Sequence, residues 1–376
     1  MKKNFIFYLP GGGIRELQGK SPWVQIPYSF SELGYSTTII TGECKICDYS
    51  KLNFVKTFEV NDRMRAIYEP FLALPKIFKY KEGGVVMVAT VGKYLFTTLP
   101  MLLIYKLIEK VTHKKKFYFI LKADWSFDYG SLGVISKWLI NLLMGVSTHA
   151  FDLVSLETYC GKERAKSIPL VKQDRVTTIS LGYPRNSIQI SKYESSRREN
   201  TILCTARISR YKGQIVLIEA FSKISAMFSD WTLEFIGPVI DEAYMKELKN
   251  AVVRNNLESR VSFLGFVDNL TLTNKYLHSS IFCLPSVYFE SAGQVKFEAT
   301  AMGLPVITTD VPCRKDAENS GYLVAKANDY TDLANNLQLL MESEQRRREY
   351  VCKAQEALKS YDDIAKEYLE FIEKKT

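Results

Sequence analysis

The stretch LPSVYFESAGQVKFEA, residues 284–299, carries the strongest structural information in the chain. An apolar strand pattern ends near Leu284, a loop follows, and a helical pattern begins near Gly293. The N–H groups at a helix start are unpaired and lie at the positive end of the helix dipole, so they suit a phosphate. Because Gly293 has no side chain, a ligand can approach the backbone closely. The segment predicts a strand–loop–helix unit that binds an anionic ligand.

Two glutamates flank the predicted helix start. Glu290 lies just before it, and Glu298 lies in the second turn. Carboxylates accept hydrogen bonds from hydroxyls, which are the main polar groups of sugars and riboses. The alternative interpretation is a pair of solvated helix charges, and for an isolated pair it would be preferred. The position of Glu290 in a loop after a strand weakens that alternative.

A basic loop follows another predicted strand, at residues 201–205. Its sequence ARISRYKG places Arg207 and Lys212 before a predicted helix at residues 214–224. Ligands of parallel α/β sheets bind at this edge, and two cations there can neutralise a diphosphate. The alternative is that both are surface charges, and this alternative also remains open for Arg210.

Short apolar runs alternate with helix-length patterns along the chain, which is typical of βαβ units. The polar stretch YESSRREN at residues 193–200 interrupts the alternation, which then restarts. We therefore expect an α/β fold with two Rossmann-like, doubly wound domains, residues 1–190 and 191–360, facing each other across a ligand-binding cleft. Residues 361–376 are expected to form a helix that packs back on the N-terminal domain.

Apolar runs and helical periodicity define the individual elements. In the predicted helix at residues 295–302, we expect the side chain of Lys296 to lie on the surface. The predicted strands are residues 4–9, 36–41, 85–89, 117–121, 153–156, 176–180, 201–205, 232–236, 261–263, 281–284 and 306–309. The predicted helices are residues 93–109, 132–144, 214–224, 244–255 and 295–302, and the tail from residue 331 is largely helical.

The composition is that of an ordinary globular protein, with 47% hydrophobic and 24% charged residues among 376. The net charge of +9 fits phosphorylated ligands, an anionic membrane or nucleic acid. No nucleic-acid-binding motif accompanies it, so we expect no nucleic-acid partner. Cys44 and Cys47 form a close pair, but no second pair completes a zinc site.

No secretory signal is expected, because the apolar run at the N-terminus is short and no small-residue cleavage site follows. The most apolar window, residues 94–108, contains Pro100 and falls short of the ~20 residues of a spanning helix. We expect a cytoplasmic protein, either soluble or at the inner face of the cell membrane. Beside this window lie the basic residues Lys106, Lys110 and Lys114–Lys116. They predict either a peripheral contact with an anionic membrane or a buried helix with a solvated basic end, and the second is slightly favoured.

Taken in order, these motifs resemble the retaining glycosyltransferases of family four, the "glycosyl transferases group 1" type. Glu290 and Glu298 match that family's two glutamates with seven residues between them. The stretch from Arg207 to Gly213 resembles its Gly-Arg-Leu…Lys-Gly loop, with Ala206 in place of the usual glycine. The motifs that follow in the family's order are Gly237-Pro238, FLGF at residues 263–266 and GLPVI at residues 303–307.

The resemblance covers residues 201–324 well and the N-terminal half loosely. It implies the GT-B fold and retaining transfer of a sugar from a nucleotide-diphosphate-sugar donor to a glycan or lipid-linked acceptor, in bacterial surface polysaccharide synthesis. The implied catalytic residues are Glu290, Arg207, Lys212 and Asp124. The implied donor-binding residues are Gly12, Gly13, Arg207, Lys212, Gly237, Phe266, Glu290, Ser291, Ala292, Gly293, Gln294 and Glu298.

The resemblance also implies individual roles. Arg207 and Lys212 would bind the donor diphosphate. Glu298 would hold the ribose, Glu290 would contact the donor sugar, and the backbone of residues 291–294 would meet sugar and phosphate. No Asp-x-Asp motif is present, so we expect no obligatory metal or other cofactor.

Two features of the N-terminal half are interpreted through the family. The glycines at residues 11–13 follow the first predicted strand, as glycines under the donor phosphates do in the family, and the alternative is a tight turn. Many members carry a histidine after an N-terminal strand. Here Asp124, after the predicted strand 117–121, takes that place, and the alternative is that it caps a loop or the next helix.

Three classes of function remain open: a retaining glycosyltransferase, another GT-B enzyme such as an inverting transferase or a nucleotide-sugar 2-epimerase, and a degenerate, non-catalytic nucleotide-sugar-binding protein. The glutamate spacing favours the first class over the second. The retained basic and acidic residues argue against the third.

Overall fold

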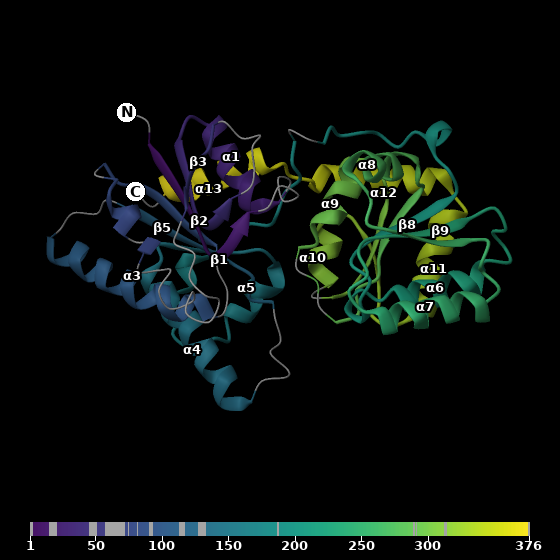
Figure 1. Cartoon of the computed structure of the whole chain (residues 1–376), viewed down its shortest axis with the longest axis horizontal. Coiled ribbons are helices and arrows are strands. Elements are labelled where there is room, and N and C mark those ends of the chain that lie inside the picture. The colour runs from purple at the N-terminus through teal and green to yellow at the C-terminus, as the bar shows by residue number, and fades with distance from the viewer. Residues whose placement is uncertain are drawn as a thin grey trace. The chain divides into compact units, whose positions relative to one another are not determined.

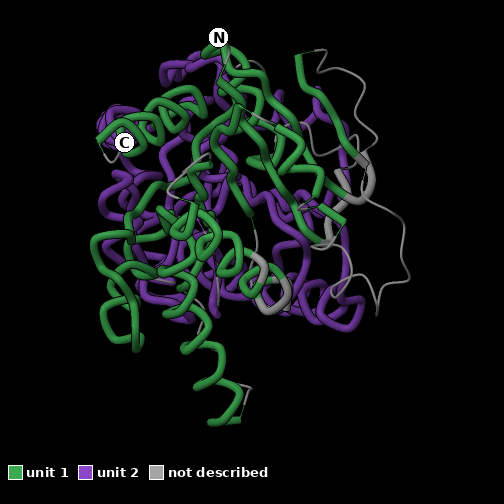
Figure 2. Tube along the Cα trace, turned by 90° about the vertical axis from the view of Figure 1, so that its left-hand side faces the viewer, with its two compact units in different colours: residues 1–184, 359–376 green, residues 185–358 purple. Residues whose placement is uncertain are grey.

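The computed structural model describes residues 3–14, 21–44, 51–56, 72–73, 75–80, 82–89, 93–112, 117–126, 133–185, 188–288, 290, 292–311 and 314–374. The chain divides into two compact units, residues 1–184 with 359–376 and residues 185–358 (Figure 2). Each unit contains a parallel β-sheet flanked by helices (Figure 1).

The first unit is built on a sheet of order β3-β2-β1-β4-β5-β6-β7, in which paired strands run parallel. Its strands are β1 (Asn4–Ile14), β2 (Ser36–Cys44), β3 (Asn53–Lys56), β4 (Gly84–Ala89), β5 (Phe117–Ala123), β6 (Leu153–Leu156) and β7 (Val176–Thr178). Its helices are α1 (Pro22–Glu32), α3 (Lys93–Thr112), α4 (Val134–Ala150), α5 (Tyr159–Ala165), the 3₁₀ turn η2 (Gln173–Arg175) and α13 (Tyr361–Glu373).

Alternate residues of β1 point to opposite faces of this sheet, so each face has its own core. Phe5 and Phe7 pack in one core with residues of α1 and α13. Ile6 and Tyr8 pack in the other core with residues of α3 and α4. Helix α13, the last in the chain, therefore completes the unit that contains the N-terminal strand.

A buried polar cluster lies beside α13. The hydroxyls of Tyr368 on α13 and Ser155 on β6 share a hydrogen bond of 2.6 Å. Lys122 Nζ, at the end of β5, lies 3.6 Å from the carboxylate of Glu157. Burial raises the pKa of Glu157, and the charge of Lys122 opposes that effect. Each buried charge in this cluster thus has an opposite charge beside it.

The second unit is built on a parallel sheet of order β10-β9-β8-β11-β12-β13. The order reverses between β8 and β11, which makes this pair the topological switch point. The strands are β8 (Thr201–Thr205), β9 (Thr232–Ile236), β10 (Val261–Gly265), β11 (Ile281–Leu284), β12 (Val306–Thr309) and β13 (Leu323–Ala325). The helices are η3 (Ser195–Arg197), η4 (Arg210–Lys212), α6 (Gln214–Ile224), α7 (Glu242–Arg254), α8 (Asn269–His278), α9 (Gln294–Ala301), α10 (Arg314–Asn319), α11 (Tyr330–Met341) and α12 (Glu344–Ala357).

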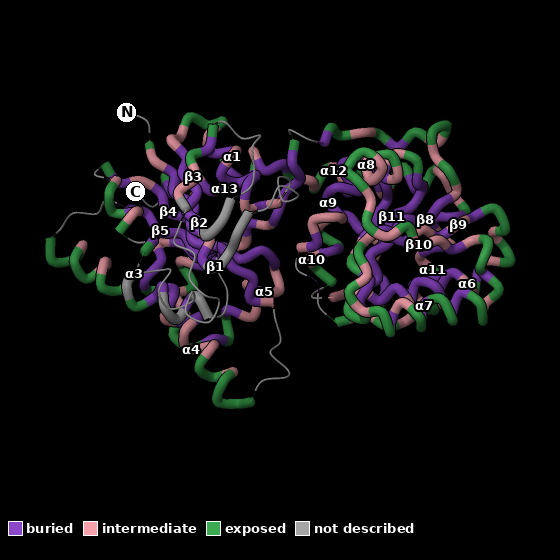
Figure 3. Tube along the Cα trace, viewed as in Figure 1, coloured by how far each residue is buried: buried purple, intermediate pink, exposed green. Residues whose placement is uncertain are grey.

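Apolar side chains of the sheet and of α6, α7 and α11 form the largest core of this unit. Leu217 and Phe221 of α6 are fully buried in it, as the helical periodicity predicts. Figure 3 shows that the strands are mainly buried and that the outer faces of the helices carry most of the exposure.

Several elements differ from the sequence predictions. Strand β1 continues to Ile14, with a register shift against β2 between Leu9 and Gly13, so Gly12 and Gly13 belong to the end of the strand and do not form a turn after it. Strands β3 and β13 and helices α1, α5, α8 and α10 are additional to the predicted set. Helix α1 begins at Pro22 and contains Pro27, and proline inside a pattern argues against a helix.

Arg198 connects the segment before β8 to the ends of two helices. Its guanidinium donates to the carbonyl oxygens of Tyr276 (3.2 Å) and Ser279 (2.5 Å) at the end of α8, and of Met302 (2.9 Å) after α9. The last carbonyls of a helix lack intrahelical donors, and a cation there also favours the helix dipole. Arg198 therefore holds this segment against the second unit.

Arg198→Met should lower the free energy of unfolding of the second unit by about 2–4 kcal/mol, because three carbonyl groups lose a charged donor. The neighbouring Arg197→Met is the control. Arg197 is exposed and pairs with Glu194 on the surface, so its loss should cost less than about 0.5 kcal/mol. Urea unfolding followed by tryptophan fluorescence measures both variants, and equal midpoints would contradict the role of Arg198.

Candidate functional site

The loops after β8 and β11 meet at the switch point of the second sheet, because these two strands are neighbours. The Val287 N–H donates to the carbonyl oxygen of Tyr211 over 3.0 Å and joins the loops. Gly213 has a φ of +66°, and a Cβ at this position would lie 2.1 Å from the carbonyl oxygen of Pro285. Only glycine fits this approach, so the two loops pack directly on each other.

Lys212 and Glu290, one from each loop, form a largely buried ion pair. Lys212 Nζ lies 2.5 Å from Glu290 Oε2, which also accepts a hydrogen bond of 2.6 Å from Ser286 Oγ. Glu290 is only 6% exposed. Charge-assisted hydrogen bonds offset the cost of removing both charges from water. The pair thus fixes one cation and one carboxylate at the carboxyl edge of the sheet.

Helix α9 begins directly after this pair, with Gly293 as its N-cap at a φ of 70°. This end is the positive end of the helix dipole, and no side chain among the described residues caps it, so it suits an anion. Glu298 is 8% exposed and accepts a hydrogen bond of 3.3 Å from Gln294 Nε2. Burial, with the charge of Glu298, raises the pKa of Tyr276, whose hydroxyl hydrogen-bonds Thr205 Oγ1 at 2.8 Å.

The sequence prediction for Lys296 is wrong. Instead of lying on the helix surface, Lys296 is only 5% exposed. Its side chain folds back over the helix start, since a Cβ on Gly293 would lie 2.6 Å from Lys296 Cε and 3.2 Å from its Nζ. Burial lowers the pKa of Lys296, and the charge of Glu290 opposes that effect. A cue was available, because long side chains of a helix point toward its N-terminus and residue 296 lies three positions after Gly293.

The two arginines of the β8–α6 loop differ in their surroundings. Arg207 is exposed, and its backbone carbonyl accepts a hydrogen bond of 2.9 Å from Gln214 Nε2. Arg210 turns to α7, where it pairs with Glu247 at 2.7 Å and lies over the ring of Tyr244. Arg207 therefore has a side chain open to a ligand, whereas Arg210 attaches the loop to α7.

Other predicted donor contacts lie around the same edge of the sheet. Gly237 follows β9, where a Cβ would lie 2.1 Å from the carbonyl oxygen of Ala206, so backbone packing already requires a glycine there. Phe266 follows β10 and is exposed, and Ala292 is half-buried before α9. Ser291 lies outside the described residues.

Asp124 belongs to the first unit, where it follows β5 and is buried. Its Oδ1 accepts hydrogen bonds from the N–H (2.9 Å) and the Oγ (2.5 Å) of Ser126. These bonds fit the alternative in which Asp124 caps a loop. Gly12 and Gly13 end β1, and β1 and β4 form the switch point of their sheet.

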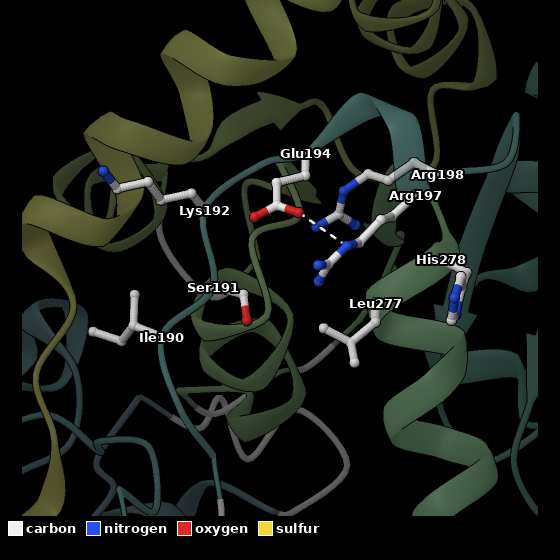
Figure 4. A pocket seen from close by; sticks show the side chains of 8 residues that line it. All are labelled: Ile190, Ser191, Lys192, Glu194, Arg197, Arg198, Leu277 and His278. Carbon is white, nitrogen blue, oxygen red and sulfur yellow. Dashed lines mark ion pairs between the residues drawn. The ribbon is translucent and has the colours of Figure 1, made fainter.

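A separate pocket of about 570 Å³ lies in the second unit (Figure 4). Its residues come from the segment before β8 and from the end of α8, which leads into β11. It therefore lies at the amino edge of the sheet, opposite to the edge where parallel α/β sheets bind ligands. The residues that line it are Ile190, Ser191, Lys192, Glu194, Arg197, Arg198, Leu277 and His278.

The group around Lys212 and Glu290 thus combines cations, a helix N-terminus and carboxylates. Cations and helix N–H groups bind phosphate, and carboxylates bind hydroxyls. The arrangement suits a ligand that carries both, such as a nucleotide or a phosphorylated sugar. Within the described parts of the chain, no three His, Cys, Asp or Glu side chains gather in a group able to hold a metal ion.

Comparison with known sequences places the second unit in context. The model of the family "Glycosyl transferases group 1" matches residues 186–357. Phosphatidyl-myo-inositol mannosyltransferase of Mycobacterium leprae is 29% identical over 153 residues, which cover 40% of this chain and 39% of that protein. The protein of the same name from Mycolicibacterium smegmatis is 28% identical over 186 residues, or 48% of this chain and 43% of that protein. The matched part spans less than half the length of each relative.

Solved structures resemble the chain over nearly its whole length. The structure of Anabaena Alr3699/HepE in complex with UDP has a TM-score of 0.72 at 15% identity and covers 99% of this chain and 100% of that one. WaaG, a glycosyltransferase involved in lipopolysaccharide biosynthesis, has a TM-score of 0.66 at 13% identity and covers 98% and 99%. These likenesses establish the fold. The expected GT-B architecture, α/β with two Rossmann-like doubly wound domains, is confirmed.

Gly213→Ala should destabilise the second unit by at least about 3 kcal/mol, because left-handed backbone strain adds to a clash with a carbonyl oxygen. Gly265→Ala is the matched control. The φ of Gly265 is also +66°, but no described heavy atom lies within 4 Å of the added Cβ. Only the backbone strain of about 1–2 kcal/mol is therefore expected, without a clash. Thermal unfolding compares the two, and equal losses would show that the two loops are not in close contact.

Proposed function

We propose that this protein transfers a sugar from a nucleotide-diphosphate-sugar donor to a glycan or lipid-linked acceptor, with retention of configuration, in bacterial surface polysaccharide synthesis. The Lys212–Glu290 pair, set at a switch point beside the N-terminal end of α9, carries the proposal. The family match of residues 186–357 supports sugar transfer. The mannosyltransferase relatives fit a lipid-linked acceptor. Structures of HepE with UDP and with UDP-glucose fit a nucleotide-sugar donor.

Each polar group then has a role in donor binding. Arg207, Lys212 and the N–H groups at the start of α9 hold the diphosphate. Glu298 accepts hydrogen bonds from the ribose, and Glu290 accepts them from the donor sugar. Asp124 acts near the transferring sugar. The remaining proposed donor contacts are Gly12, Gly13, Gly237, Phe266, Ser291, Ala292, Gly293 and Gln294.

Transfer requires that the bond between the anomeric carbon and the phosphate oxygen breaks. The bonding electrons leave with the diphosphate, and the sugar passes through an oxocarbenium-like state. Lys212, Arg207 and the start of α9 stabilise the charge that gathers on the diphosphate. The acceptor hydroxyl attacks from the same face and forms the new bond, and its proton passes to the leaving phosphate oxygen. No protein nucleophile and no metal enter this scheme.

Two other classes of function predict different products. An inverting GT-B transferase would give the opposite anomer, and a nucleotide-sugar 2-epimerase would act on the donor without an acceptor. A non-catalytic protein would bind the donor without turnover. The spacing of Glu290 and Glu298 favours the retaining transferase over the other two GT-B enzymes, and the retained basic and acidic residues argue against a non-catalytic protein.

Lys212→Ala, Glu290→Gln and Glu298→Ala should each lower kcat/KM for sugar transfer by about 10²-fold or more, since each removes a charge from the donor site. Arg210→Ala, in the same loop but paired with Glu247, should stay within about twofold of the unaltered protein.

A thermal-shift panel of UDP-, GDP-, ADP- and dTDP-sugars first selects the donor, because a ligand at a hundredfold excess over Kd adds about 2.7 kcal/mol of stability.

Near-normal activity of all three site variants would contradict the residue assignment. A product of inverted configuration, determined by NMR of the anomeric proton, would contradict the retaining reaction while leaving sugar transfer in place.

We also propose that the first unit meets an anionic membrane at the inner face of the cell membrane, where a lipid-linked acceptor would lie. Lys110 is exposed on α3 and suits anionic headgroups, whereas Lys106 pairs with Glu109 and Asp152. Lys114–Lys116 lie outside the described residues. Helices α3 and α4, which contact each other, expose the apolar side chains of Ile104, Leu107, Ile108, Val111, Val134, Ile135 and Trp138.

Exposed apolar side chains gathered on two adjoining helices are typical of an interaction surface. Both helices belong to the first unit, which we propose binds the acceptor. None of the helices in the described part of the chain combines the length and the apolar character that crossing a membrane requires.

Ile135→Gln combined with Trp138→Gln should weaken binding to vesicles that contain phosphatidylglycerol by about tenfold or more, because two inserted apolar side chains are lost. Met227→Gln is the control, since Met227 is exposed on the second unit. Co-sedimentation at several salt concentrations measures the binding. If the unaltered protein stays in the supernatant when the vesicles are sedimented at low salt, the membrane proposal is wrong.

A further inference from the structure

Among the described residues, Lys296 is a buried cation with no carboxylate at ion-pair distance, and the charges of Glu290 and Asp316 act on it only from farther away. In the described part of the chain, no Asp or Glu oxygen lies within 4.0 Å of its Nζ. The other buried lysine described, Lys122, has the Glu157 carboxylate at 3.6 Å. The ring centroid of Tyr322, at 5.8 Å, offers Lys296 only a weak attraction. Burying an ammonium group without a partner is unfavourable, so its presence at this position requires a compensating anion.

The ammonium group lies where an anion would bind. A Cβ on Gly293 would lie 3.2 Å from Lys296 Nζ and 3.5 Å from Glu290 Cγ, so both side chains meet at the start of α9. Lys212 reaches the same carboxylate at 2.5 Å. Two lysines therefore lie near one glutamate, and the positive end of the helix dipole adds to the positive potential. An anionic oxygen bound at this position would give Lys296 the close partner that Glu290 and Asp316 do not provide.

We propose that Lys296 is a further donor-binding residue whose ammonium group holds the phosphate that bears the sugar. The inference rests on the proposed transfer from a nucleotide-diphosphate sugar. Lys296 lies beside Glu290, the proposed sugar contact, whereas Glu298, the proposed ribose contact, lies farther along α9. The phosphate next to the sugar is therefore the one that Lys296 meets. The same phosphate gains charge as the sugar leaves, so Lys296 stabilises the leaving group.

The test compares nucleoside diphosphates with monophosphates on the full chain. Isothermal titration with UDP, GDP and ADP, and with UMP, GMP and AMP, first identifies the nucleotide that the unaltered protein binds. Lys296→Met should then weaken the diphosphate by about tenfold or more and the monophosphate by less than about twofold, since only the diphosphate has the second phosphate. Lys223→Met is the control, because Lys223 also lies over a tyrosine ring, that of Tyr330, but on the outer end of α6.

Protein stability separates a binding role from a structural one. The thermal midpoint of Lys296→Met without nucleotide should be unchanged or higher, because methionine suits a buried position better than an unpaired ammonium. If this variant does not fold, Lys296→Gln replaces it in the same titrations.

Three results overturn the inference. The first is an unchanged diphosphate affinity, and the second is an equal loss for monophosphate and diphosphate. The third, from parallel titrations of nucleotide sugars with and without a carboxylate on the sugar, is a loss confined to the donors that bear the carboxylate, which would place Lys296 at the sugar and not at the phosphate. Failure of the unaltered protein to bind any nucleoside diphosphate or nucleotide sugar would instead reject the proposed function, so the two failures can be told apart.

Discussion

The candidate site depends on one close contact, that of Gly213 with the carbonyl oxygen of Pro285. Because no side chain separates the loops after β8 and β11, a lysine from one loop reaches a glutamate 78 positions away in the other. The start of α9 follows directly, and the positive end of its dipole adds to the same positive region. A side chain at position 213 would push the loops apart and separate these groups. The electrostatics of the site are therefore a consequence of backbone packing at the switch point.

Much of the fold was predictable because buried parallel strands are continuous apolar runs. The bounds of β6, β8, β9, β11 and β12 match the predicted ranges residue for residue. Strand β13 has only three residues, too few for a pattern, and α1 contains proline where a sequence pattern argues against a helix. The extension of β1 through its glycines could not be predicted either, because glycine has low strand propensity and only pairing with β2 makes that segment a strand.

Site residues that belong to a recognisable motif could be predicted from the sequence. A residue whose role depends on its burial could not. Lys212, Glu290 and Glu298 stand out by type and spacing, and the structure brings the first two into contact. Lys296 appears in the sequence as one charge in a short helix, and such charges are usually solvated. In the structure, residues 296–301 of α9 are all buried, so a lysine there cannot reach bulk solvent. Only tertiary packing shows that this helix has no outer face at that position.

The placement of α13 has a consequence for how the chain is made. Tyr361, Ile364 and Tyr368 cover the same sheet face as Phe5 and Phe7, although they are synthesised after the whole second unit. During translation, α1 covers only part of that face of the first sheet, and the rest stays uncovered until residues 361–373 have left the ribosome. The second unit is contiguous, from residue 185 to 358, and can close its core earlier. Folding on the ribosome should therefore run against the order of the sequence, with the nascent first unit in need of protection from aggregation for most of elongation.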